Sequence, residues 1–466
     1  MDNVTTETPS ADRGVSYRDA VPGPVPTSNG SLSLLRRLRQ MRQTYPIEVF
    51  ENLISEQKIG RFRYIILNDP DAIRHVLVEN AKSYGKSPFL RRLLEPALGQ
   101  GLLTSDGETW QRHRRLMAPV FAHRNLNRFA PAIATATSHM LERWDRSSDG
   151  SPIDLADEMS MLTLSSIART MFGAEDDRIL EGIVQIVARY QDAVGIGLAD
   201  LLGLPNWVPR LSTIRGRYIV RHLNQVVDQL IERDRRPGHL LIDILTDDGG
   251  GSGQKLSRQE VRDQIVTILT AGHETTAQTM NWTWYLLSKH PDVEVKLIEE
   301  LDEVLGGRTP AYEDLSRLVY AKAVVQESMR LFPPVPTFSR LCLADDAILG
   351  RRVAKGSIVM IAPWILHRHR SFWSDPDIFE PERFLETGER PRAYIPFGAG
   401  PRICIGASFA MMEAVLILAQ VAQRYRLRLM PGHRIEPVVR IALRSRYGMK
   451  MIATRRSAAG LAKLAL

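Results

Sequence analysis

The sequence contains very few cysteines. Only two, Cys342 and Cys404, occur in 466 residues. A disulfide-stabilised scaffold or a structural zinc site needs more thiols or a closer cluster of them. We therefore expect a protein of a reducing compartment, the cytoplasm. Cys342 lies in an apolar stretch (RLCLA) and is predicted to be a core residue without a further role.

Long apolar segments are also missing from the N-terminal part of the chain. Its first residues, MDNVTTETPSADRG, contain neither the apolar core of a signal peptide nor the longer run of a membrane anchor. We expect no membrane anchor. Residues 1–20 are predicted to be a disordered tail, residues 21–454 the folded domain, and residues 455–466 a C-terminal tail.

Acidic residues are outnumbered by basic ones, and the formal net charge is +8. Basic surfaces attract nucleic acids. However, the arginines are spread along the chain without a recognisable nucleic-acid-binding module. We expect no nucleic-acid partner, and an acidic protein docking on one basic face explains the charge more simply.

The hydrophobic residues, 44% of the chain, follow mostly helical periodicity. A capping-box pair, Ser257 and Glu260, opens a helix that should run to about residue 289, before Pro291. A helix of that length spans on the order of 45 Å and must cross the whole molecule. The fold is predicted to be mainly α with small β-sheets. Further helices are expected at 155–172, 183–200, 226–245, 293–305, 318–331 and 407–425, and short strands at 63–67, 347–349 and 358–362.

The most informative segment is 397–406, which reads FGAGPRICIG and places Cys404 directly before an apolar helix. A helix N-terminus favours a thiolate and should lower the thiol pKa. The three glycines, Gly406 among them, allow a flat ring system to approach the backbone, and Phe397 can shield the sulfur from water. A lone cysteine at such a position is more often an inert core residue. The complete pattern favours a metal ligand instead.

This pattern, FxxGxRxCxG, resembles the haem-binding signature of the cytochrome P-450 family, and the resemblance runs from about Pro22 to Met451. It implies the cytochrome P-450 fold, a single large helical domain whose long central helix crosses the haem. It also implies haem b (iron protoporphyrin IX) as cofactor, with Cys404 as the thiolate ligand of the iron.

Other signatures of that family follow the expected order. Glu327 and Arg330 form its ExxR pair, and Arg383 in PERF (381–384) usually completes the triad. In isolation, the pair would be a surface salt bridge between residues three apart, which is common and weak. Before the Cys404 loop, a buried charge network that braces the loop is the better interpretation.

The segment AGHETT (271–276) lies midway along the long helix and resembles the oxygen-activation motif of the family. Gly272 and Thr275 are predicted to let the helix open locally and leave room for dioxygen. Glu274 and Thr275 are the acid and alcohol assigned to proton relay. His273 is not expected to be a ligand.

Four further residues resemble positions that bind the haem propionates. Trp110 and Arg114 match the WxxxR pattern and share one helix face, and guanidinium groups suit paired carboxylates well. Arg340 and Arg402 complete this cofactor-binding set.

The implied reaction is the insertion of one oxygen atom from O2 into an apolar organic substrate, by hydroxylation or epoxidation. The haem-domain resemblance uses nearly all of the chain, so two electrons are expected from separate proteins, a ferredoxin or flavodoxin with its reductase. Arg112 and Arg115 could form the docking surface for that partner.

The substrate itself stays open among fatty acids, terpenoids, steroids and aromatic compounds, because the expected pocket lining is apolar but its shape is unknown. The lining residues expected from the resemblance are Ile265, Ile268, Leu269, Ala271, Val335, Phe338 and Ile441.

Three other functions compete with this interpretation. A peroxide-driven peroxygenase or isomerase would not need Glu274 and Thr275. A non-catalytic haem sensor or carrier of apolar ligands would not turn over with electron donors. An all-helical binding protein without haem would have to produce four ordered motifs by chance.

Overall fold

The computed structural model describes residues 48–59, 62–147, 149–173, 256–385, 391–440 and 442–456, with shorter pieces at 25–27, 44–46 and 240–246 and single helical residues at 182, 186, 225, 227 and 228. The predicted tail 1–20, most of the helices predicted at 183–200 and 226–245, and residues 457–466 lie outside the described residues.

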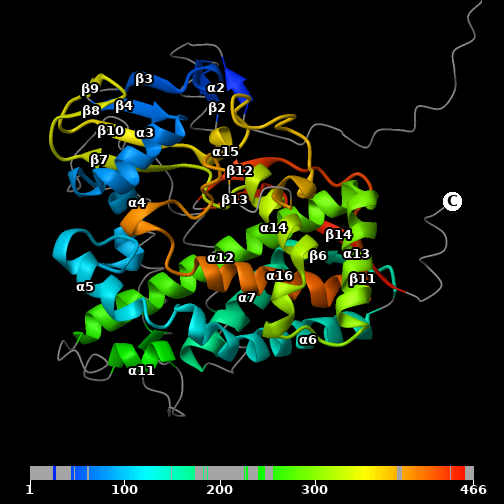
Figure 1. Cartoon of the computed structure of the whole chain (residues 1–466). Helices are drawn as coiled ribbons and strands as arrows, with labels where there is room; N and C mark the ends of the chain where they lie inside the picture. Colours follow the sequence, from blue (N-terminus) through cyan, green and yellow to red (C-terminus); the bar gives the residue numbers. More distant parts are fainter. Residues whose placement is uncertain are drawn as a thin grey trace, which may run out of the picture.

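The described chain has a β-rich part and a larger helical part (Figure 1). The β-rich part centres on a five-stranded sheet of order β3-β4-β10-β7-β5, in which β10 runs parallel to β4 and the other pairs are antiparallel. The predicted strands at 63–67 and 358–362 are confirmed within it, and 347–349 overlaps β8 of a separate hairpin. The sheet strands are β3 (Ile54–Ile59), β4 (Phe62–Leu67), β5 (Tyr84–Lys86), β7 (Phe338–Cys342) and β10 (Ile358–Ile361).

The long helix predicted from Ser257 onward is α12 (Arg258–Lys289). Its capping box is formed, since the Ser257 hydroxyl accepts from the Glu260 N–H at 3.2 Å and the Glu260 carboxylate accepts from the Ser257 N–H at 2.9 Å. Its C-cap is His290, and Pro291 begins α13 (Pro291–Leu305). Most of α12 is buried, as a helix that crosses the molecule requires.

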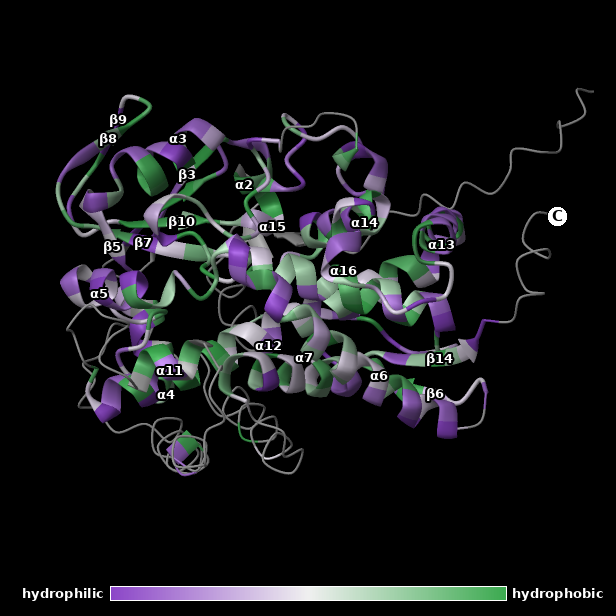
Figure 2. Ribbon diagram, turned by 60° about the horizontal axis from the view of Figure 1, so that its bottom comes forward, coloured by the Kyte–Doolittle hydropathy of each residue, from purple (hydrophilic) through white to green (hydrophobic). Residues whose placement is uncertain are grey.

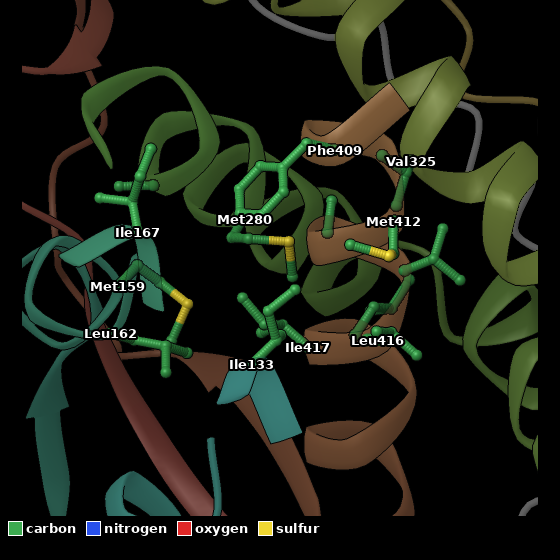
Figure 3. Close-up of a cluster of buried hydrophobic side chains, with 14 of the residues drawn as sticks. Ile133, Met159, Leu162, Ile167, Met280, Val325, Phe409, Met412, Leu416 and Ile417 are labelled. Atoms are coloured by element: carbon green, nitrogen blue, oxygen red, sulfur yellow. The ribbon is translucent and has the colours of Figure 1, made fainter. Parts of the chain in front are cut away.

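The most extensive helix contacts of α12 are with α7 (Leu155–Phe172), α14 (Val319–Leu331) and α16 (Ala407–Arg424). A further helix, α6 (Ala130–Arg146), covers α7 and α16. Their apolar faces meet in one large core, where Met280 of α12, Ile167 of α7 and Phe409 of α16 lie together (Figure 3). Full burial of each such side chain contributes about 1.5–3 kcal/mol relative to exposure. The peripheral helix α13 is largely hydrophilic in Figure 2, whereas α7 and α16 are mostly apolar.

The prediction of a mainly α fold with small β-sheets is confirmed. No helix in the described ranges is long and apolar enough to cross a membrane. The remaining elements are β1 (Val25–Thr27), β2 (Thr44–Pro46), α2 (Glu48–Glu51), α3 (Pro70–Arg74), η1 (His75–Glu79), η2 (Ala81–Ser83), α4 (Pro88–Leu98), α5 (Gly107–Met117), η3 (His123–Arg128), β6 (Pro152–Asp154), α11 (Leu240–Thr246), η4 (Tyr312–Ser316), β8 (Asp346–Ile348), β9 (Arg351–Val353), α15 (Pro363–Leu366), η5 (Pro381–Phe384), η6 (Gly400–Arg402), β11 (Tyr425–Leu429), β12 (Pro437–Val439), β13 (Leu443–Ser445) and β14 (Lys450–Arg455).

Candidate active site

The Cys404 loop is held as a tight turn between η6 and α16. The Cys404 N–H donates to the Phe397 carbonyl at 3.0 Å, and the Ile403 N–H donates to the Gly400 carbonyl at 3.0 Å. Gly400 has φ +71°, and a Cβ there would lie 1.8 Å from the Leu77 carbonyl oxygen of η1. This glycine is therefore required by backbone packing against η1, whereas the sequence suggested only the approach of a flat ligand.

The Cys404 side chain keeps accessible surface, yet protein atoms surround it so closely that burial dominates its ionisation. Cys404 is therefore accessible to a ligand, although protein atoms crowd around it. Burial raises the pKa of Cys404 above its usual value, and the Gly406 N–H and the Arg114 charge only partly offset this rise. The prediction that the pKa of Cys404 is lowered is thus wrong for the protein without a bound metal. A coordinated metal ion deprotonates a thiol directly, so a metal-bound thiolate does not need the lowered pKa.

Positive charge accumulates beside this loop. The register of β5 with β7 pairs Lys86 with Arg340, and both cations lie near Arg402. Burial and mutual repulsion lower the pKa of Lys86 to about 7 and that of Arg340 to about 10. Asp106 is the acid that faces them, and it accepts from the Lys86 backbone N–H at 2.6 Å and from Arg402. One carboxylate does not balance three cations.

The geometry around Arg402 supports an anionic ligand. Its guanidinium lies 4.1 Å from the centre of the Trp110 ring. Its Nη1 atom is buried and has no hydrogen-bond partner among the described residues. Arg114 donates to the Ile403 carbonyl at 2.8 Å and so ties α5 to the Cys404 loop. An unpartnered buried N–H group and excess positive charge fit the two carboxylates of a haem.

Lys86 is the site residue that the sequence did not indicate. It belongs to no recognised motif, and in the sequence it is one lysine among 61 basic residues. Only the pairing of β5 with β7 brings it to Arg340. Hydrogen bonding between strands so far apart in the sequence cannot be read from local pattern.

The AGHETT segment remains a regular α-helix throughout. The Thr275 hydroxyl donates to the Ala271 carbonyl at 2.7 Å. The Glu274 carboxyl is 6% exposed and accepts from the Gln278 amide at 3.3 Å. The expected local opening of the helix is therefore not present in this structure, because the intrahelical bonds are retained.

Gly272 has a different physical role from the predicted one. A Cβ on Gly272 would lie 2.0 Å from the Cδ1 atom of Ile167, which is 2% exposed in α7. The missing side chain therefore lets α7 approach α12. The sequence suggested that it makes room for dioxygen, and the helix face that it occupies is the one that packs on α7.

Replacing Gly272 by alanine is expected to lower the free energy of unfolding by about 1–3 kcal/mol, because the added methyl group overpacks the contact with Ile167. The variant Ile167→Val removes the clashing atom. In the Ile167→Val background, Gly272→Ala should lower the free energy of unfolding much less, because the clash is gone and alanine favours the helix by about 1 kcal/mol over glycine. Urea unfolding of the four proteins measures the coupling, and additive effects would contradict this account.

The predicted charge network is present and buried. Glu327 and Arg330, both 0% exposed, form two hydrogen bonds of 2.6 and 2.7 Å. Arg383 reaches the same carboxylate at 3.2 Å. Arg330 also donates to the carbonyl of His367 at 2.8 Å, and the His367 ring accepts from the Ile395 N–H at 3.0 Å, just before the Cys404 loop. The alternative of a surface salt bridge is wrong.

The predicted pocket residues divide into two groups. Ile265 and Leu269 are 0% and 1% exposed and belong to the main core, as does Ile268. Their assignment to a substrate pocket stays a prediction. Ala271, Val335 and Phe338 remain partly exposed, and Ile441 lies outside the described residues.

Two other predictions concern single side chains. Cys342 is buried, and its thiol donates to the Ala344 carbonyl at 2.8 Å, which confirms a core residue. Arg112, expected on a docking surface, forms an ion pair with Glu260 at the start of α12. Its charge is thus partly neutralised within the chain.

Comparison with known proteins matches residues 22–448 to the family model described as Cytochrome P450. The chain is 34% identical to cyclooctatin synthase of Streptomyces melanosporofaciens over 440 residues, covering 91% of this chain and 92% of that protein. It is 32% identical to cyclooctat-9-en-7-ol 5-monooxygenase of the same organism over 421 residues, with coverage of 88% and 90%.

A third relative is pentalenene oxygenase of Streptomyces avermitilis, with 31% identity over 434 residues and coverage of 90% and 93%. The family model and these relatives all extend over most of the chain, across the Cys404 loop, the buried ExxR network and the long helix α12. The chain belongs to the cytochrome P450 family and is a haem-thiolate monooxygenase with haem b as its cofactor.

Proposed function

We propose that this chain oxygenates a cyclic terpenoid, a hydrocarbon or a simple alcohol derived from one. Cys404 would supply the thiolate that holds the haem iron, and the accessible surface of this residue in the loop before α16 is the observation that carries the proposal. The substrate class is supported by the names of the relatives, two of which refer to oxygenation of cyclooctat-9-en-7-ol and of pentalenene. The partly exposed apolar side chains of Val335 and Phe338 are compatible with such ligands.

The residues around Cys404 would hold the cofactor through its carboxylates. Arg340 and Arg402 are the predicted partners, and we add Lys86, a partly buried cation of the same cluster. The Arg402 guanidinium lies over the ring of Trp110. Arg114 fixes the loop through the Ile403 carbonyl. Residues 21–454 are taken as the haem-binding domain.

Bound haem with a thiolate ligand supplies the activation of dioxygen and favours O–O cleavage. The chain's own part is to hold protons and exclude water. Thr275 on α12 is a partly exposed residue that carries a hydroxyl group, and Glu274 beside it is an acid within the same turn. We assign to this pair the transfer of protons toward the oxygen, which requires the Thr275 hydroxyl to leave the Ala271 carbonyl.

Electrons are proposed to come from a separate ferredoxin or flavodoxin with its reductase, in the cytoplasm, as the scarcity of cysteine favours. Arg115 is exposed and is the stronger candidate for a docking contact, because Arg112 is paired with Glu260. This surface would act mainly on the rate of association.

The substrate proposal is tested by titrating haem-loaded protein with pentalenene and with dodecanoic acid. The terpene is expected to shift the iron from low to high spin at a concentration roughly tenfold lower than the fatty acid, a difference of about 1.4 kcal/mol. With a plant ferredoxin, its reductase and NADPH, mass spectrometry should show an oxygenated terpene.

Preferential binding and oxidation of the fatty acid would contradict the substrate class. Product formed with hydrogen peroxide but not with the reductase system would favour the peroxygenase alternative. Terpene binding without any turnover would favour a carrier.

A further inference from the structure

The segment 99–106, which joins α4 to α5, is held on the start of α12 through its backbone. The Gln100 N–H donates to the Asp263 carboxylate at 2.7 Å, and the Leu102 N–H donates to the side-chain oxygen of Gln264 at 2.9 Å. Asp263 and Gln264 are both buried in α12. Two polar side chains of the long helix therefore hold a connection that would otherwise have no reason to lie against it.

The side chain of Gln264 also contacts a histidine of α5, His113, which is 0% exposed. The Gln264 amide nitrogen lies 3.0 Å from His113 Nδ1. An amide NH2 group can only donate, so Nδ1 must accept and the ring proton must be on Nε2. That N–H faces the Glu260 carboxylate at 3.3 Å. The arrangement therefore requires a neutral His113 in one defined tautomer.

A second proton on this ring is incompatible with the bond to Leu102. A protonated His113 carries a hydrogen on Nδ1, which then faces the NH2 group of Gln264, so two donors oppose each other. Turning the amide over offers its oxygen to the ring, but the NH2 group then faces the Leu102 N–H. Either way one hydrogen bond of the chain is lost, and a buried N–H group is left without an acceptor.

Charged groups of both signs surround the ring. Glu260 and Asp263 of α12 favour its protonation, whereas Arg112 of its own helix opposes it. The helix α11 also packs on α5 at this end of α12 and carries one titratable residue, Asp243 (Figure 1). Burial outweighs the two acids and lowers the pKa of His113 from its ordinary value of 6.5.

The direction of this shift decides how pH acts. When the segment is released and the ring reaches water, His113 regains its ordinary pKa. Below a pH of about 6.5 the released state therefore binds a proton that the held state does not. The held state is favoured at neutral pH and loses stability as the pH falls.

The other end of the same segment belongs to the candidate active site. Asp106 accepts from the Lys86 backbone N–H at 2.6 Å and from the Arg402 guanidinium. The segment 99–106 is thus fixed at two places, on α12 through Leu102 and on the cation cluster through Asp106. Release of the first attachment should weaken the second.

We propose that His113 and Gln264 form a pH-sensitive latch, which holds the segment 99–106 on α12 while His113 is neutral and releases it when the ring takes up a proton from solvent. Both are positioning residues, because they act on the site only through this segment. Release loosens Asp106 from Arg402, so the cofactor should be held less firmly at acidic pH. The latch is separate from the oxygenation reaction and needs neither substrate nor electrons.

Three variants test the latch. His113→Asn offers an amide oxygen in place of Nδ1, which can accept from Gln264 but cannot be protonated. Gln264→Glu accepts from the Leu102 N–H and also from a protonated ring, so it should reverse the effect of pH. His290→Asn is the matched control, because His290 is also buried, with Nδ1 2.7 Å from the Leu286 carbonyl, but lies at the other end of α12.

The first readout is hydrogen–deuterium exchange of haem-loaded protein at pH 7.5 and 5.5, on peptides that cover residues 99–106. Rates are corrected for the intrinsic effect of pH on exchange. Protection should fall about tenfold in the unmodified protein, because each pH unit below the pKa of the released histidine shifts the equilibrium tenfold. His290→Asn should show the same fall. His113→Asn should keep its protection, and Gln264→Glu should be protected at least as well at pH 5.5.

The second readout is the rate of haem transfer to an excess of apomyoglobin at pH 7.5 and 6.0. Transfer from the unmodified protein and from His290→Asn should quicken on the order of fourfold at the lower pH, following the same proton linkage. Transfer from His113→Asn should change much less.

Equal protection of residues 99–106 at the two pH values in the unmodified protein would overturn the latch, and so would a tenfold fall that persists in His113→Asn. If His113→Asn does not load haem, the direction of the pH effect in Gln264→Glu decides. A change in protection without a change in haem transfer would overturn the link to Asp106. Failure of the monooxygenase function would appear instead as no reductant-dependent oxygen consumption, which neither readout measures.

Discussion

Replacing Cys404 by serine is expected to abolish the thiolate spectrum of the ferrous carbon monoxide complex and to lower the oxygenation rate by at least about three orders of magnitude. A serine hydroxyl stays protonated and does not donate electron density as a thiolate does. The electron donation that favours O–O cleavage is therefore lost. Cys404 is accessible, and the described part of the chain holds no other cysteine near this loop. Optical spectroscopy of the reduced, carbon monoxide-treated protein measures the first effect.

The matched control is Cys342→Ser. Cys342 is buried in β7 and donates to a backbone carbonyl, which a serine hydroxyl can also do. This variant should retain the thiolate spectrum with at most a modest loss of stability. An unchanged spectrum in Cys404→Ser would show that Cys404 is not the iron ligand. Loss of the thiolate spectrum in Cys342→Ser, with haem retained, would contradict the assignment as well.

Replacing Glu327 by glutamine is expected to lower the free energy of unfolding by about 3–5 kcal/mol and to weaken retention of the cofactor. The change removes the carboxylate charge that two guanidinium groups share, those of Arg330 and Arg383. Breaking a fully buried pair leaves an uncompensated charge away from water, which costs far more than losing a surface pair. Because Arg330 also holds the His367 carbonyl, the effect should extend to the Cys404 loop.

Urea unfolding and transfer of haem to an excess of apomyoglobin measure the two consequences. The matched control is Glu56→Gln, because Glu56 also pairs bidentately with an arginine, Arg63, at 2.5 and 2.7 Å, but on the surface. That variant should change neither quantity appreciably. Equal effects of the two substitutions would show that the buried Glu327 network contributes no more to stability and cofactor retention than a surface ion pair.

Several details of the site were predicted incorrectly for one common reason, which is that they depend on packing between distant segments. The net pKa of Cys404 is raised because burial outweighs the helix N-terminus. Gly272 serves the approach of Ile167 in α7.

By itself, the sequence determined the family, the mainly α fold, the bounds of α12 within a residue or two, the position of Cys404 and the Glu327–Arg330–Arg383 triad. All of these depend on local spacing: a capping box, a helical repeat, or a motif whose residues act through near neighbours. Only the tertiary structure brought Lys86 to Arg340, packed Gly272 of α12 against Ile167 of α7, and decided which groups are buried. Burial and long-range pairing set charge states, and they arise from contacts between segments hundreds of residues apart, which no local pattern contains.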